Sequence, residues 1–202
     1  RLPKLFLNDP AGFVKWVEAA RVFVNQYPLK LEPKSVKSAQ DVLEVVLKIC
    51  NKFKKLIEDN GLSKELYNDS NQKPRHEESS QKLLYAIADS YCEANDIDLT
   101  RESDAGRGPV DFKFSNGYKS RVLIEVKLNK NNPRKGYEKQ LAVYQKAESA
   151  ENAVFLVIIV TSNTKDVDDL EKFVADLKRR KQVCPELIVV DGRVKPSASK
   201  IN

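Results

Sequence analysis

The sequence predicts an α/β protein with a mixed central sheet flanked by helices, preceded by a small all-helical N-terminal region. Three observations predict this class. Residues 1–70 carry apolar side chains at helical spacing. From His76 onward, helical patterns alternate with short strand patterns. The run from Ala153 to Val160 is unbroken in apolar character, which is typical of a strand covered on both faces.

The chain has 202 residues, a length that suggests one domain with an appendage. A polar stretch from Asn68 to Arg75 is the candidate linker. We therefore expect a helical region over 1–70 and an α/β domain over 71–202. The helical region would contact a partner or nucleic acid, or pack on the core.

Two helices are expected in the N-terminal region. Asp9 and Pro10 resemble an N-cap followed by proline at the first helical position, and Pro28 ends that pattern. A second helix begins near Ser35 and ends before Gly61.

The remaining elements follow from periodicity and turn residues. Ser115, Asn116 and Gly117 predict a hairpin turn between two strands. The expected elements are a helix over 76–95, strands over 109–115 and 119–128, a helix over 135–149, a strand over 154–161, a helix over 166–181 and a strand over 187–190.

Composition excludes several classes of protein. The longest apolar run is too short to span a bilayer, and charged residues interrupt the start of the chain, so we expect neither a membrane protein nor a secretory segment. Three widely spaced cysteines indicate reduced thiols in a cytoplasmic protein. The absence of Met, with Arg1 as first residue, favours a processed chain or a domain of a longer protein.

Three side chains on two neighbouring strands carry the predicted chemistry. Glu125 and Lys127 stand two apart on one strand and therefore share a face. Pairing across the hairpin can bring Asp111 close to Glu125. Two adjacent carboxylates repel each other unless a cation joins them. Oxygen ligation by Asp111, Glu125 and a backbone carbonyl suits Mg²⁺, with Mn²⁺ as a substitute.

These residues resemble the signature of the PD-(D/E)XK nuclease superfamily, which has the restriction-endonuclease-like fold. Asp111 is followed fourteen positions later by Glu125, Val126 and Lys127, while Pro109 stands two positions before the Asp instead of one. The resemblance covers about residues 76–161. It implies catalytic roles for Asp111, Glu125 and Lys127, with the Val126 carbonyl among the metal ligands.

The helix that begins at residue 76 resembles the first core helix of this superfamily, which supplies an additional acid to the site. Glu77 and Glu78 are the two candidates. Glu77 shares a face with Gln81 and Leu84, the stripe expected to meet the sheet, so it is assigned as the additional catalytic and metal-binding acid.

Gln140 and Tyr144 resemble the QxxxY motif of RecB-like members of the superfamily. Four residues apart on a helix, they share one face. The resemblance implies that both support the catalytic lysine, the metal ligands or the phosphate.

The chain's net charge of +6 is concentrated near these residues. Between Lys113 and Lys139 there are eight basic and two acidic residues, and the rest of the chain is balanced. Phosphates would approach this region. The expected nucleic-acid contacts are Lys113, Lys130, Arg134, Lys135 and Lys139.

The leading hypothesis is a Mg²⁺-dependent nuclease acting on DNA, with RNA as the alternative substrate, in restriction, repair or anti-phage defence. The first alternative is a nucleic-acid-binding module on the same fold without turnover. The second is an interaction protein that binds its partner through residues 1–70. A homodimer is left open.

Overall fold

The structure, a computed structural model, describes residues 35–68, 73–104, 109–140, 146 and 149–195, without the side chains of residues 103, 104, 109, 139 and 140. Contacts divide the chain into two units, Arg1–Glu32 and Pro33–Asn202, and every described residue belongs to the second. The helix expected after Pro10 lies outside the described residues.

In the described part of the chain, five strands form one mixed sheet in the order β1-β2-β3-β4-β5. β1 (Asp98–Asp104), β2 (Pro109–Asn116) and β3 (Ser120–Leu128) are antiparallel neighbours. β4 (Asn152–Ile159) and β5 (Glu186–Asp191) continue the sheet parallel to β3.

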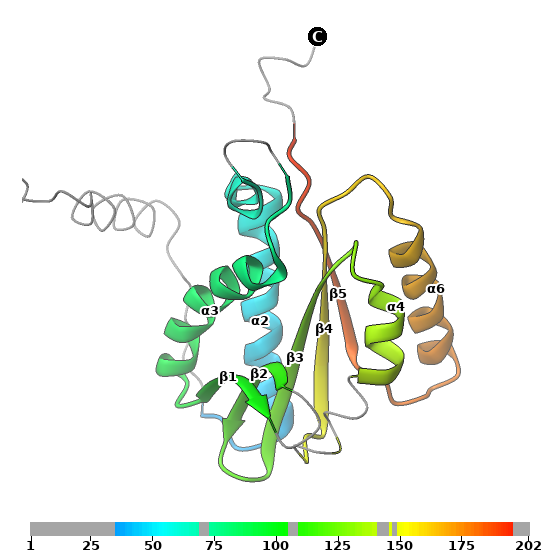
Figure 1. Cartoon of the computed structure of the whole chain (residues 1–202). Coiled ribbons are helices and arrows are strands. Elements are labelled where there is room, and N and C mark those ends of the chain that lie inside the picture. The colour runs from blue at the N-terminus through cyan, green and yellow to red at the C-terminus, as the bar shows by residue number, and fades with distance from the viewer. Residues whose placement is uncertain (1–34, 69–72, 105–108, 141–145, 147–148, 196–202) are drawn as a thin grey trace, which may run out of the picture. The chain divides into compact units, whose positions relative to one another are not determined.

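Helices cover both faces of this sheet (Figure 1). α2 (Ala39–Glu58) and α3 (Glu77–Ala94) lie on one face, and α4 (Pro133–Lys135) and α6 (Lys165–Arg179) lie on the other. The two crossovers between parallel strands contain α4 and α6, as parallel pairing requires a long connection. The predicted α/β class, a mixed central sheet flanked by helices, is confirmed.

Helix α2 belongs to the same unit as the sheet. Its N-cap is Ser38, whose side chain accepts a hydrogen bond from the Asp41 amide at 3.2 Å. Its apolar stripe is fully buried, including Val46, Ile49 and Phe53. The short 3₁₀ helix η2 (Leu62–Leu66) follows it.

The hairpin between β2 and β3 forms where the turn residues predict it. Asn116 pairs with Ser120, so Gly117, Tyr118 and Lys119 make the loop. Gly117 has a φ of 71°, in the left-handed region that glycine adopts without steric cost.

β1 was not expected from its sequence, which is largely polar. It pairs with β2 from Asp98↔Ser115 to Asp104↔Pro109, so its stability comes from the ladder. Glu102, in its middle, has a φ of 51° and is irregular for a strand. The long-range pairing therefore overrides the local preference of these residues.

The helix expected over 135–149 begins in the structure at Pro133. α4 is followed by a turn of π-helix, η3 (Gly136–Gln140), and residues 141–145 and 147–148 lie outside the described residues. The ring of Tyr137, in η3, meets Phe155 edge to face with centroids 5.4 Å apart.

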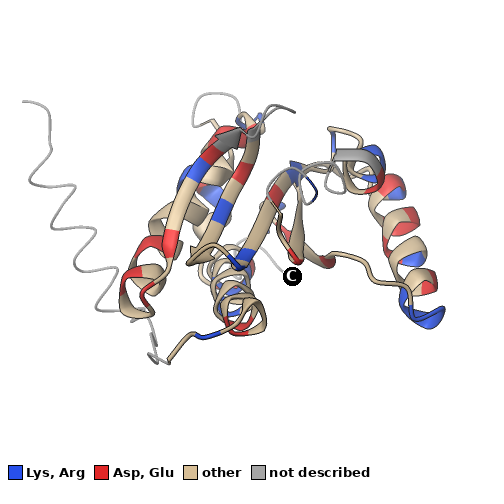
Figure 2. Cartoon of the chain, turned by 90° about the horizontal axis from the view of Figure 1, so that it is seen from below, with Lys and Arg blue, Asp and Glu red and all other residues tan. Residues whose placement is uncertain are grey.

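α6 packs on the face of the sheet opposite α2 and α3 (Figure 1). Val167, Leu170 and Val174 join Phe155 and Val157 of β4 in one buried cluster. The outer side of α6 is charged along its length (Figure 2), with acidic residues in the first turn and basic residues in the last. No described helix has the length and the apolar character needed to cross a membrane.

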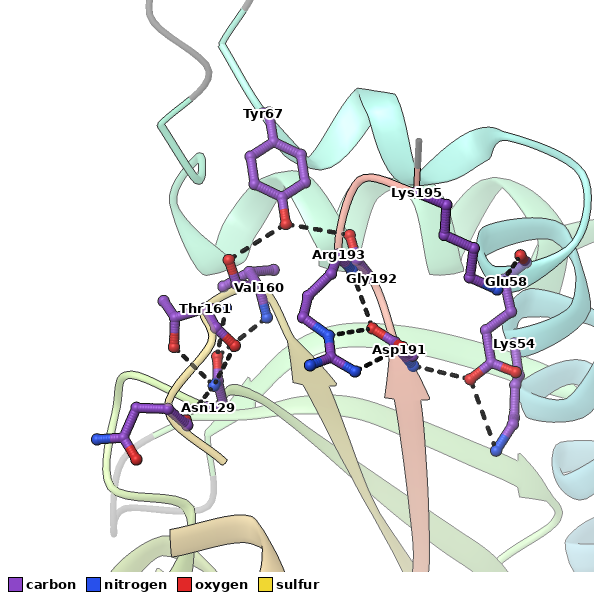
Figure 3. A network of polar contacts seen from close by, with 11 residues as sticks. Lys54, Glu58, Tyr67, Asn129, Val160, Thr161, Asp191, Gly192, Arg193 and Lys195 are labelled. Atoms are coloured by element: carbon purple, nitrogen blue, oxygen red, sulfur yellow. Dashed lines mark hydrogen bonds and ion pairs between the residues drawn. The ribbon is translucent and has the colours of Figure 1, made fainter. Parts of the chain in front are cut away.

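Polar contacts join the C-terminal ends of the three parallel strands (Figure 3). The buried Asn129, directly after β3, accepts from the amides of Val160 and Thr161 at 3.0 and 3.3 Å and donates to the Thr161 hydroxyl at 2.8 Å. Tyr67 donates to the carbonyls of Val160 and Gly192 at 3.2 and 3.1 Å. This end of β3 is where the candidate site lies.

Candidate active site

The site is assembled from the C-terminal half of β3, one residue of β2 and the first two turns of α3. Glu125 and Lys127 alternate with apolar residues along β3 and therefore leave the strand on the same face. Asp111 comes from β2, and Glu77 is the first residue of α3.

The Lys127 ammonium lies between two carboxylates. Its Nζ is 2.8 Å from Glu125 Oε1 and 3.0 Å from Glu77 Oε1. The side chains of Lys127 and Glu125 are 15% and 3% exposed, so both ion pairs are shielded from bulk water and weakly screened.

Glu77 also holds the backbone where β3 ends. Its Oε2 accepts from the Leu128 amide at 3.0 Å and from Asn131 Nδ2 at 2.9 Å. Glu78, the alternative acid, instead pairs with Lys82 at 2.9 Å, and its side chain is 60% exposed. The structure therefore brings Glu77, and not Glu78, to Lys127.

The side chain of Asp111 takes the place of a backbone hydrogen-bond acceptor between β2 and β3. The pairing of β2 with β3 runs from Asn116↔Ser120 to Phe112↔Ile124. Beyond it, Asp111 Oδ2 accepts from the Val126 amide at 2.7 Å, and Oδ1 accepts from Gln81 Nε2 at 2.8 Å.

Glu125 is incompletely satisfied. It is buried, and no described residue donates to its Oε2. Leaving a buried carboxylate oxygen without a donor or cation is costly. This oxygen is the position in the site where an added cation would gain most.

Burial and mutual repulsion perturb the titration of these groups. Burial, followed by the charge of Glu125, raises the pKa of Asp111 to about 7. Burial likewise raises the pKa of Glu125, although Lys127 opposes the shift. Burial lowers the pKa of Lys127, but the charges of Glu125, Glu77 and Asp111 outweigh it and raise this pKa above its ordinary value. Lys127 is therefore an ammonium at neutral pH.

A cavity of about 560 Å³ opens over the site, large enough for a nucleotide-sized group. It reaches Asp111 from solvent. Its lining residues are all polar and half of them are acidic, namely His76, Glu77, Glu78, Gln81, Glu102, Asp111, Lys130 and Asn131.

The donor chemistry fits a hard divalent cation. Asp111 and the unsatisfied Glu125 Oε2 offer carboxylate oxygens, which Mg²⁺ and Mn²⁺ prefer. Within the described part of the chain, no three His, Cys, Asp or Glu side chains form a ready-made metal-binding group. Lys127 instead pairs with both Glu125 and Glu77 and offsets one of their two negative charges. Val126 contributes its amide to Asp111, and the assignment of its carbonyl as a ligand stays a prediction.

The remaining predicted residues fall into two groups. The Gln140 side chain, Tyr144 and the Lys139 side chain lie outside the described residues, so their roles stay predictions. Lys130 lines the cavity and is exposed. Lys135 is exposed, directly before η3.

Two of the predicted phosphate contacts have surroundings that limit their freedom. The Arg134 guanidinium pairs with Glu138 at 2.7 Å and stacks over the Phe173 ring at 3.8 Å from its centroid. Lys113 is half-buried on β2 and has an interaction partner.

Sequence reasoning missed two residues of the site. Gln81 was noted only as part of the buried stripe of α3, and its position four residues after Glu77 was the available signal. Asn131 lies in the loop after β3, and nothing in the sequence indicates that its amide meets Glu77.

Comparison with known proteins gives one match. A family model described as a domain of unknown function (DUF8371) matches residues 42–162, a span that contains Glu77, Asp111, Glu125 and Lys127. No curated protein and no solved structure matches the chain.

Proposed function

This chain belongs to the DUF8371 family, and we propose that it is a metal-dependent nuclease that hydrolyses phosphodiester bonds of DNA. The observation that carries the proposal is the buried, unsatisfied oxygen of Glu125 beside the hydrogen-bonded carboxylate of Asp111. Lys127 pairs with Glu125 on β3 and with Glu77 on α3. A structural ion pair alone would leave no reason for an unsatisfied buried carboxylate oxygen.

Asp111 and Glu125 would hold the cation, Mg²⁺ or Mn²⁺, with the Val126 carbonyl as the predicted third ligand. When bound, the ion would polarise a phosphoryl oxygen and lower the pKa of a coordinated water. A buried carboxylate, Glu125, and a half-buried one, Asp111, which repel each other without a cation, are the electrostatic requirement for such a site.

Lys127 would act as a fixed positive charge. The paired carboxylates of Glu125 and Glu77 keep it protonated, so it is suited to orienting the attacking water and stabilising the negative charge that develops on the phosphate. Removal of the proton from the water by Lys127 is disfavoured, because its pKa is raised.

Glu77 would position Lys127. Three donors already surround its carboxylate, namely the Lys127 ammonium, the Leu128 amide and the Asn131 amide group. This engagement favours a positioning role over the direct metal ligation that the superfamily resemblance implies, and ligation by Glu77 stays a prediction.

The location and biological role belong to the same proposal. All three cysteines are free, which favours a reducing cytoplasm, where DNA is also accessible. Restriction, repair or anti-phage defence are the roles that the resemblance implies.

Cleavage assays test the proposal. Purified protein with Mg²⁺ is incubated with single-stranded DNA, double-stranded DNA and RNA, and products are separated on gels. We expect cleavage by the wild type and at least a 100-fold loss in Asp111→Asn and Lys127→Met, because each removes a charge next to the reacting phosphate. Lys64→Met, a matched change at an exposed lysine of η2, should cleave at the wild-type rate.

Circular dichroism spectra establish that each variant is folded. Absence of cleavage of all three substrates by the wild type, or equal activity in Lys127→Met, would contradict the nuclease proposal.

A second candidate is a nucleic-acid-binding module without turnover. It is favoured by the ion pairs of Lys127 with Glu125 and Glu77, which offset part of the negative charge of the site and so reduce the need for a metal ion. A gel-shift experiment combined with the cleavage assay discriminates the two functions. The binding module would shift DNA in the gel, and the DNA would stay intact with Mg²⁺ and with Mn²⁺.

A further inference from the structure

The side chain of Asp111 is held outside the regular ladder of the sheet. The β2–β3 register ends at the pair Phe112↔Ile124, and Asp111 and Glu125 are the next residues beyond it on the two antiparallel strands. Because the Asp111 carboxylate takes the Val126 amide in place of a backbone carbonyl, its orientation depends on side-chain contacts.

One of these contacts comes from α3. Gln81 Nε2 donates to Asp111 Oδ1 at 2.8 Å, so both carboxylate oxygens of Asp111 have a donor. One turn earlier, Glu77 contacts the Lys127 ammonium and the Leu128 amide, each at 3.0 Å. Residues four apart on one helix therefore contact β2 and β3 separately.

The chemistry of a glutamine suits this position. Asp111 is half-buried, and Glu125 is the next residue of β3 beyond the last β2–β3 pair, so like charges already repel each other there. A carboxylate at position 81 would add to that repulsion and offer no donor. An ammonium would neutralise Asp111 and compete with a divalent cation. An uncharged amide donates a hydrogen bond and leaves the negative charge available to a metal ion.

We propose that Gln81 is a positioning residue for Asp111, which orients this carboxylate for a divalent cation and, together with Glu77 on the same helix, sets its placement relative to Lys127. This inference rests on the proposed function, since it assigns Asp111 as a metal ligand. Loss of a side chain that hydrogen-bonds a metal ligand typically lowers metal affinity or activity by about 10- to 100-fold.

The test measures Mn²⁺ binding and catalysis separately. Free Mn²⁺ is quantified by electron paramagnetic resonance during titration of the wild type, Gln81→Leu and Gln182→Leu. The last variant carries the same change at an exposed position after α6 and serves as the control. We expect Gln81→Leu to bind Mn²⁺ about 10- to 100-fold more weakly, and the control to bind as the wild type does.

In cleavage assays, the Mg²⁺ concentration for half-maximal rate should rise by a similar factor in Gln81→Leu, while the KM for DNA stays within about twofold. The separation of metal dependence from KM distinguishes positioning of a ligand from general damage to the site.

A second variant, Gln81→Lys, separates positioning from mere stabilisation. The ammonium can still contact Asp111, so thermal unfolding without metal should occur at the wild-type temperature or above, whereas Mn²⁺ binding should be lost. A purely structural hydrogen bond would be preserved by this change, and wild-type Mn²⁺ affinity in Gln81→Lys would overturn the inference.

The outcomes also distinguish the two proposals. Wild-type Mn²⁺ affinity in Gln81→Leu, with cleavage intact in the wild-type protein, overturns the role of Gln81 and leaves the nuclease proposal standing. A wild-type protein that binds no Mn²⁺ and cleaves no substrate overturns both.

Discussion

Asp111 is the residue at which the proposed metal-binding role and the stability of the fold most clearly oppose each other. It is largely buried, lies near two further carboxylates and accepts hydrogen bonds from Gln81 and Val126. Its pKa of about 7 means that ionisation is disfavoured in the metal-free protein. The proposed role of Asp111 as a ligand of a divalent cation would account for this cost, because a bound cation would remove it.

Replacing Asp111 by Asn should therefore stabilise the metal-free protein. The isosteric amide keeps the volume and removes the charge. Its oxygen can accept from the Val126 amide, and its NH₂ group can donate to the Gln81 amide oxygen once the Gln81 amide turns over. Since one pKa unit corresponds to about 1.4 kcal/mol, we expect a gain of about 1–3 kcal/mol in the free energy of unfolding at pH 8, measured by urea denaturation with EDTA.

The gain should depend on pH. The pKa of Asp111 is raised above the unfolded value, so the wild type loses stability as pH rises from about 4 to about 7, and the Asn variant lacks this loss. The two proteins should be nearly equal near pH 4. Asp89→Asn, an exposed change on α3, should shift stability by less than about 0.5 kcal/mol. An Asn variant less stable than the wild type at pH 8 would be inconsistent with this account.

At the scale of elements, the site depends on how the parallel strands end. β3, β4 and β5 stop at one edge of the sheet, and Asn129 occupies the junction of the first two (Figure 3). Its Oδ1 accepts hydrogen bonds from the amides of Val160 and Thr161. These two residues follow β4 and lie beyond the last pair of the β4–β5 register. This junction leads directly into the loop that carries Lys130 and Asn131 to the cavity.

Asn129→Ala should destabilise the protein by about 2–4 kcal/mol, because it leaves the buried Val160 amide and the half-buried Thr161 amide without their partner and opens space at a buried position. Thr161→Val removes only the hydroxyl that accepts from Asn129 and should cost about 1 kcal/mol. Urea denaturation of both variants checks this order. Equal losses in the two variants would show that the hydroxyl, and not the backbone amides, is the contact that matters.

At the scale of the whole described unit, the core is continuous from α2 through the sheet to α6. Val46 and Phe53 of α2 are fully buried, as are Phe155 of β4 and Leu170 of α6. The three cysteines differ in burial. Cys50 and Cys92 are buried in this core, and Cys184 is half-buried two residues before β5.

Thiol reactivity should report this difference. Burial raises the pKa of both Cys50 and Cys92 to about 12, so neither forms the reactive thiolate at pH 8. We expect iodoacetamide to modify one thiol, Cys184, in the folded protein and all three after denaturation, as counted by intact mass spectrometry. Rapid modification of Cys50 in the folded protein would contradict the packing of α2 on the sheet.

Local patterns were sufficient to predict much of the fold. The hairpin was predicted because Gly117 permits a positive φ, and the apolar run near Ala153 indicated a central strand. β1 could not be predicted, because it is polar and contains Glu102 with a positive φ, and only pairing with β2 makes it a strand. The turn of π-helix after α4 could not be predicted from the spacing of apolar residues either.

The candidate site was predicted in part. Asp111, Glu125 and Lys127 follow from alternation along two strands joined by a short turn. Which basic residues are available for phosphate contacts could not be predicted. Arg134, for example, pairs with Glu138 and stacks on Phe173, which is distant in sequence. The contact of Gln81 with Asp111 likewise depends on where α3 crosses the sheet.

The sequence by itself determined which side chains share a strand face or a helix face, because the periods of 2.0 and 3.6 are properties of the local backbone. It therefore determined that Glu125 and Lys127 project together, and that Glu77 and Gln81 do. Only the tertiary structure decided that these two pairs meet, that Lys127 lies between two acids, and that one oxygen of Glu125 is buried without a partner. The physical reason is that burial and ion pairing depend on the packing of α3 against β2 and β3, which no local pattern encodes.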